Sequence, residues 1–167
     1  MRIEVLPNVI TGANLVLGMF AIVYAMEGKY VTGAVMILAA ALLDRLDGKL
    51  ARKMGISSEF GKELDSLADL VSFGVAPAIM VYLWKLNTLG LPGLLVIISF
   101  VLCGALRLAR FNIMNITGYF LGVPITIAGS LVAIIVLAAG RAPVLITAAL
   151  VFILAGFMIS TIKLPKF

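Results

Sequence analysis

The carboxylates of this chain gather in one short stretch. All four aspartates and two of the four glutamates lie between residues 44 and 69, in the sequence DRLDGKLARKMGISSEFGKELDSLAD. Asp44 and Asp47 are three residues apart and Asp65 and Asp69 are four apart, so on helices each pair projects from one face. Four carboxylates brought together repel one another unless a cation lies among them. Because oxygen ligands favour hard cations, the pattern indicates Mg²⁺, Mn²⁺ or Ca²⁺, as one ion or a close pair.

The residues that follow the first pair suit a ligand that carries phosphate. Gly48 and Ala51 fall on the same side of a helix as Asp44, where their small size leaves space beside the carboxylates. Arg52 can reach the same face and donate paired hydrogen bonds to a phosphate. The stretch therefore predicts a site for a metal-bound diphosphate. A solvated loop, the simplest alternative, accounts for the neighbouring lysines and glutamates but not for two helical pairs of aspartates.

The rest of the chain is strongly apolar. Of its 167 residues 63% are hydrophobic and 13% are charged, and the mean hydropathy is +1.19, values typical of integral membrane proteins. A spanning helix needs about 20 mostly apolar residues. The sequence predicts six such helices, over residues 9–26, 30–50, 64–84, 91–108, 121–139 and 144–160. We therefore expect an all-α integral membrane protein in which residues 1–167 form a single domain without internal repeats.

The basic residues predict how this domain lies in the membrane. With six spans both termini share one side, and ten of the 13 lysines and arginines fall on that side. Such an excess marks the cytoplasmic face, so we expect a multi-pass protein of the cell membrane with its termini and aspartates at that face. The net charge of +5 then suits anionic lipid, not nucleic acid. A single cysteine and the absence of histidine exclude an internal disulfide and histidine-bound metals.

The spacing of the aspartates resembles that of a known enzyme family. Asp44-x-x-Asp47-Gly48-x-x-Ala51-Arg52, then eight residues, then Gly61-x-x-x-Asp65-x-x-x-Asp69 is similar to the signature of the CDP-alcohol phosphatidyltransferases. Pro7-Asn8-x-x-Thr11 resembles the opening motif of that family. The stretches DLVSFGVAPA (69–78), ALRLARFN (105–112) and GYFLGVPITIAG (118–129) resemble its phosphatidylserine synthase branch.

The resemblance implies a six-helix membrane enzyme, usually a homodimer, that acts on a CDP-activated lipid. L-serine would attack the lipid-bearing phosphorus and release CMP. The resemblance implies that two ions of Mg²⁺ or Mn²⁺, with Ca²⁺ as an alternative, are held by Asp44, Asp47, Asp65 and Asp69. Asp69 would also be the catalytic general base. The CDP-lipid site would be lined by Asn8, Thr11, Gly48, Ala51, Arg52, Ser58 and Gly61.

Recognition of serine requires a partner for its carboxylate. Arg107 and Arg110 are three residues apart and share one helical face, and Asn112 lies just beyond them. Because arginine suits bidentate capture of a carboxylate, we expect at least one of the two to bind serine. The alternative is that both arginines only anchor a helix at the cytoplasmic surface. Asn14 continues the spacing of Asn8 and Thr11 along the first helix, and the sequence alone leaves its role undecided.

Three other functions share parts of this pattern. Another family member would use glycerol phosphate or inositol phosphate as acceptor, and CDP-linked diacylglycerol and archaeol carry the same head group. A cation or proton transporter also buries carboxylates, although typically near the membrane midplane and with repeat symmetry. An intramembrane prenyltransferase also holds a diphosphate through aspartates and Mg²⁺, but it normally has two separated aspartate-rich motifs. A phosphatidyltransferase releases CMP, a prenyltransferase releases pyrophosphate and a transporter releases neither.

Overall fold

The computed structural model describes the backbone of residues 5–54, 58–113, 119–161 and 163–165, and the side chains of residues 8–46, 48, 58–113 and 122–161. The helices of this part are α1 (Val5–Met26), α2 (Tyr30–Met54), α3 (Glu59–Asp69), α4 (Ala76–Trp84), α5 (Leu91–Ile113), α6 (Ile125–Ala138) and α7 (Val144–Ile159). A π-helical segment, η1 (Leu70–Val75), joins α3 to α4, and a short 3₁₀ helix, η2 (Leu86–Leu89), follows α4. Two short strands, β1 (Tyr119–Leu121) and β2 (Lys163–Pro165), pair antiparallel.

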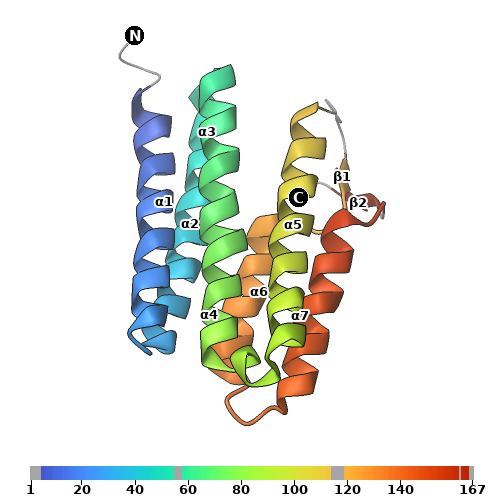
Figure 1. The fold of residues 1–167 in the computed structure, drawn as a ribbon. Coiled ribbons are helices and arrows are strands. Elements are labelled where there is room, and N and C mark those ends of the chain that lie inside the picture. Colours follow the sequence, from blue (N-terminus) through green and yellow to red (C-terminus); the bar gives the residue numbers. More distant parts are fainter. Residues whose placement is uncertain (1–4, 55–57, 114–118, 162, 166–167) are drawn as a thin grey trace.

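The helices lie side by side as a bundle (Figure 1). Since α3, η1 and α4 continue one another over Glu59–Trp84, the described residues form six helical rods, one for each predicted span. Asn8–Met26, Glu59–Trp84 and Leu91–Ile113 are long and apolar enough to cross a membrane, while α6 and α7 are shorter apolar helices. The prediction of a helical membrane protein is confirmed at this level. The number of crossings and the side of the termini stay predictions.

The surface of the bundle is apolar as well as its interior. Phe20, Leu95, Phe152 and Ile153 are each at least half exposed. In water, a helix normally places polar residues on the face that looks away from the core. Helices that are apolar on both faces are expected where the outer face contacts lipid.

Helix boundaries differ from the predicted spans at the polar ends. The second helix runs on to Met54 and the third begins at Glu59, so the connection is shorter than the gap between the predicted spans 30–50 and 64–84. The last α-helix but one begins at Ile125, not at residue 121. Pro124 precedes its first turn with an extended ψ of 140°, and Gly122 before it has a positive φ of 71°. A glycine in this left-handed conformation marks a turn, which the hydropathy pattern did not register.

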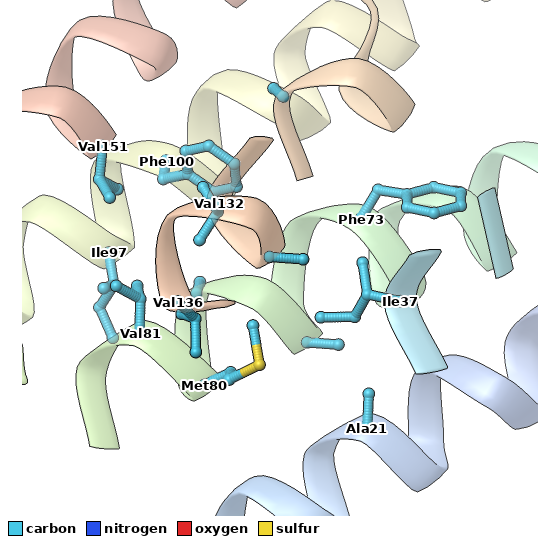
Figure 2. Close-up of a cluster of buried hydrophobic side chains, with 14 of the residues drawn as sticks. Ala21, Ile37, Phe73, Met80, Val81, Ile97, Phe100, Val132, Val136 and Val151 are labelled. Atoms are coloured by element: carbon cyan, nitrogen blue, oxygen red, sulfur yellow. The ribbon is translucent and has the colours of Figure 1, made fainter. Parts of the chain in front are cut away.

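Every rod contributes side chains to one continuous core (Figure 2). The labelled residues of Figure 2 come from α1, α2, η1, α4, α5, α6 and α7, and they are Ala21, Ile37, Phe73, Met80, Val81, Ile97, Phe100, Val132, Val136 and Val151. Small side chains among them, such as Ala21, let neighbouring helix backbones approach closely, as is common in membrane bundles.

The π-helical segment is clamped between two helices through glycines. A Cβ atom on Gly129 of α6 would lie 2.7 Å from the Cα of Phe73 and would also meet the Phe73 carbonyl oxygen. On the other side, Gly18 of α1 faces Ser72, whose hydroxyl donates to the carbonyl oxygen of Asn14 at 3.0 Å. Single π-helical turns inside α-helices often occur at functional sites. This one begins directly after Asp69, so the clamp also fixes the last turn of α3.

The contact between α6 and η1 gives a test of the packing. We expect Gly129→Val to destabilise the protein by about 1–3 kcal/mol, because its side chain would collide with the backbone of Phe73, which cannot rotate away. Gly156→Val is the matched control, since a Cβ there meets no described atom within 4 Å. Thermal unfolding in detergent measures both. Equal unfolding temperatures for the two variants would contradict this packing.

Candidate active site

Three of the four aspartates meet in space. Asp44 of α2 and Asp65 and Asp69 of α3 each offer a carboxylate oxygen, and these oxygens lie within 4.8 Å of one another. Asp44 and Asp65 are half-buried and Asp69 is 8% exposed. Oxygens bound to one divalent cation at about 2.0–2.6 Å can be at most about 5 Å apart. The cluster therefore has the donor atoms and the spacing that fit Mg²⁺, Mn²⁺ or Ca²⁺.

The structure describes the backbone, but not every side chain, of the remaining predicted residues in the aspartate stretch. The side chains of Asp47, Ala51 and Arg52 are not among the described ones, and Gly48 is half-buried on α2. All four belong to the same continuous helix as Asp44. The helical spacing that the sequence predicts for Asp44 and Asp47 is therefore confirmed at the level of the backbone.

Asp69 is held by the first helix. The Nδ2 of Asn14 donates to Oδ1 of Asp69 at 3.4 Å, and the Asn14 side chain is itself 1% exposed. Asp69 is the last residue of α3, and the Coulombic field of Asp44, Asp65 and Arg107 acts on it. A buried carboxylate with two like charges and one opposite charge around it is a typical candidate for proton transfer or metal binding.

Asp44 has a partner on the sixth helix that the sequence analysis did not predict. The Oγ1 of Thr126 donates to Oδ2 of Asp44 at 3.4 Å. Thr126 lies in the first turn of α6, within the stretch GYFLGVPITIAG. A hydroxyl in the first turn of an apolar helix was the signal available in the sequence, but only the packing of α6 against α2 shows what it contacts.

Three of the residues expected to line a CDP-lipid site lie together at the start of α3. Ser58 is the N-cap of this helix, and its hydroxyl accepts a hydrogen bond from the Gly61 amide at 3.0 Å. A Cβ on Gly61 would lie 3.1 Å from the Ser58 hydroxyl and 3.2 Å from Oδ1 of Asn8. Glycine at this position therefore allows α1 and α3 to approach. Thr11, one turn further along α1, is buried.

Arg107 and Arg110 lie in different environments although they share a helical face. Arg107 is 7% exposed, and its Nε is buried without a hydrogen-bond partner among the described residues. Arg110 is half-buried and donates to the carbonyl oxygens of Ile159 and Ser160 at 3.3 and 3.2 Å. Those carbonyls belong to the end of α7, where helix geometry leaves acceptors unsatisfied. Arg110 is thus engaged in joining α5 to α7.

Asn112 joins α5 to α3. Its Nδ2 donates to the hydroxyl of Ser66 at 3.0 Å and to both carboxylate oxygens of Glu63 at 3.3 Å. Its backbone carbonyl accepts from the Nζ of Lys62 at 3.0 Å. Lys62 and Glu63, which we expected to be merely solvated, are part of this contact. Ser66 directly follows Asp65. These hydrogen bonds therefore hold α3, which carries Asp65 and Asp69, against α5, which carries Arg107.

Known proteins resemble this chain over nearly its whole length. Residues 4–161 match the family described as CDP-alcohol phosphatidyltransferase. The CDP-diacylglycerol–serine O-phosphatidyltransferase of Helicobacter pylori (strain ATCC 700392 / 26695) is 38% identical over 170 residues, covering 96% of this chain and 72% of the relative. The proteins of that name from Bacillus subtilis (strain 168) and Methanocaldococcus jannaschii are 37% and 39% identical; the matches cover 97% and 99% of this chain and 90% and 76% of those relatives.

A family match over residues 4–161, together with a cluster of three aspartates taken from the signature itself, leads to one conclusion. The chain belongs to the CDP-alcohol phosphatidyltransferase family.

Proposed function

We propose that this protein is a CDP-diacylglycerol–serine O-phosphatidyltransferase. It would transfer the phosphatidyl group of a CDP-activated lipid to the hydroxyl of L-serine and release CMP. The observation that carries the chemistry is the cluster of Asp44, Asp65 and Asp69, whose oxygens lie within 4.8 Å of one another. The choice of serine rests on the names of the relatives, which match almost the whole chain.

The aspartates would bind the divalent cations on which the reaction depends. Asp47, on the same helix as Asp44, would complete a set of four carboxylates for two ions of Mg²⁺ or Mn²⁺, with Ca²⁺ as an alternative. When bound, such cations offset the charge of the diphosphate and stabilise both the attacking and the leaving oxygen. The half-buried position of Asp44 and Asp65 supports this proposal, because like charges removed from water require compensation.

Asp69 would act as the general base. In the proposed step the serine hydroxyl oxygen forms a bond to the lipid-bearing phosphorus, and its proton passes to the Asp69 carboxylate. The bond from that phosphorus to the CMP oxygen breaks, and CMP leaves with the electron pair. The hydrogen bond from Asn14 to one oxygen of Asp69 supports this role, since it fixes the carboxylate and leaves its other oxygen for the substrate.

The CDP-lipid would lie beside the aspartates, along α1, α2 and the start of α3. Asn8, Ser58 and Gly61 meet there, which supports their assignment to this site. Thr11, Gly48, Ala51 and Arg52 belong to the same proposed set. The apolar outer surface of the bundle would let the lipid chains stay in the membrane. The excess of basic residues supports a cytoplasmic active site, and we propose a homodimer as in the resembled family.

Arg107 would bind the carboxylate of serine. Of the two candidate arginines it is the more deeply buried, and its Nε has no hydrogen-bond partner among the described residues. Arg110 already donates to the end of α7, and Asn112 to α3. We therefore propose that these two hold the helices, whereas Arg107 recognises substrate.

The identity of the acceptor can be tested with the wild-type protein. Purified protein with Mn²⁺ and CDP-diacylglycerol should release CMP when L-serine is added. Glycerol 3-phosphate, inositol and inositol phosphate, offered separately, should give at least about tenfold less CMP. Release with one of these acceptors and not with serine would contradict the proposed function while leaving the family assignment intact. The same assay with a CDP-archaeol lipid compares the two lipid classes.

The role of Asp69 predicts a sharp loss of turnover. Asp69→Asn should lower kcat by at least about 100-fold, because an amide cannot accept the hydroxyl proton, while binding of CDP-lipid changes little. Glu59→Gln, the same chemical change at an exposed position of the same helix, is the matched control. Near-normal turnover of Asp69→Asn would remove Asp69 from the role of base.

The role of Arg107 predicts a change in serine affinity. Arg107→Met keeps a long side chain but removes the charge, so the KM for serine should rise by about tenfold or more, with less effect on CDP-lipid binding. Arg110→Met should instead weaken the α5–α7 contact and lower the unfolding temperature. An unchanged KM in folded Arg107→Met would mean that the carboxylate of serine is bound elsewhere.

A further inference from the structure

Two buried polar atoms near Asp69 have no hydrogen-bond partner among the described residues. One is the acceptor Oδ1 of Asn14, and the other is the donor Nε of Arg107. Their side chains are 1% and 7% exposed, respectively. A buried polar atom without a partner is costly, so the few that a native protein keeps usually serve a ligand, an ion or a water molecule.

Both side chains act on the same carboxylate, one through a hydrogen bond and the other through its charge. The Asn14 amide donates to Asp69 at 3.4 Å, and the charge of Arg107 acts on Asp69 without an ion pair between these two described residues. Because a carboxylate only accepts hydrogen bonds, the NH₂ group of Asn14 must face Asp69 and its carbonyl oxygen must point elsewhere. Asp69 is therefore flanked by one unused acceptor and one unused donor.

The position of Asn14 is fixed by its own backbone. The hydroxyl of Ser72 donates to the Asn14 carbonyl oxygen at 3.0 Å, and Gly18 leaves room for Ser72 one helical turn further on. This contact holds α1 against η1, directly below the last turn of α3. The backbone of Asn14 is thus held by Ser72 and its amide NH₂ by Asp69, while Oδ1 has no partner among the described residues.

We propose that Oδ1 of Asn14 accepts a hydrogen bond from the ammonium group of the acceptor amino acid. This inference rests on the proposed function, in which serine is the acceptor. Serine carries three groups around one carbon: an ammonium that donates, a carboxylate that accepts and a hydroxymethyl that must reach the base. Oδ1 of Asn14, Arg107 and Asp69 offer the complementary acceptor, donor and base. Asn14 is then a specificity-determining residue that selects an α-amino acid over an acceptor without an ammonium group.

The test compares serine with two analogues that each lack one charged group. 3-Hydroxypropionate is serine without the ammonium, and ethanolamine is serine without the carboxylate. We measure the KM for serine and the inhibition constants of both analogues as competitors of serine. In Asn14→Leu, the KM for serine and the inhibition constant of ethanolamine should rise by about tenfold or more. The inhibition constant of 3-hydroxypropionate should change less than about threefold. In Arg107→Met, the KM for serine and the inhibition constant of 3-hydroxypropionate should rise, and the inhibition constant of ethanolamine should stay unchanged.

The comparison within one variant separates recognition of a charged group from loss of folded protein. A smaller fraction of folded protein affects both analogues alike, so it cancels in the ratio of their inhibition constants. Asn14→Thr keeps an oxygen acceptor and should restore part of the selectivity. Asn87→Leu, the same substitution at an exposed asparagine that donates to Leu83, is the matched control. If a variant has no turnover, equilibrium dialysis of the labelled analogues against the CDP-lipid complex replaces the kinetics.

Each other outcome has a distinct meaning. An equal rise of both inhibition constants in Asn14→Leu would overturn the inference. Asn14 would then only orient Asp69. A higher Mn²⁺ requirement with unchanged analogue selectivity would also overturn it, because the oxygen would then serve the cation. Wild-type protein that releases CMP with another acceptor but not with serine would instead overturn the proposed function, and this inference with it.

Discussion

The mutual repulsion of three carboxylates is the constraint on which the rest of the site depends. Two unit charges about 5 Å apart repel by roughly 3 kcal/mol at an effective dielectric constant of about 20, and Asp44, Asp65 and Asp69 form three such pairs. Partial burial adds the cost of lost hydration. A divalent cation would convert this repulsion into attraction. The proposed chemistry uses the same cation to compensate the diphosphate, so one interaction would both stabilise the cluster and prepare the substrate.

The packing of the bundle explains how these charges stay in place. Around the end of α3, Asn14 comes from α1, Asp44 from α2, Arg107 from α5 and Thr126 from α6. Asn112 ties α5 to α3 beside Asp65, and Gly129 lets α6 pack on the π-helical turn that follows Asp69. The site is thus a layer of polar side chains in an otherwise apolar bundle. Such a position suits a reaction between a lipid in the membrane and a charged, water-soluble acceptor.

Local sequence signals predicted the parts of this arrangement that depend on a single helix. Hydropathy located the six helical rods, and helical spacing placed each pair of aspartates on one face. The signals failed where tertiary packing decides the outcome. Arg107 and Arg110 look equivalent in sequence, yet one is buried near Asp69 and the other joins the end of α7. Asn112 was expected beside the serine site, and its contact with α3 could not be read from the sequence; its role toward serine stays a prediction. Thr126 lies 82 residues from Asp44 along the chain, so no local pattern could link them.

Equilibrium binding of Mn²⁺ to the purified protein, without substrates, tests the central claim most directly. Free Mn²⁺ can be followed by its electron paramagnetic resonance signal while the protein is titrated. We expect saturable binding by the wild-type protein and its loss in the triple variant Asp44→Asn, Asp65→Asn, Asp69→Asn, which should remain folded because the mutual repulsion is also removed. Equal Mn²⁺ binding by the wild-type protein and a folded triple variant would contradict the account, since the cation would then be held by other residues.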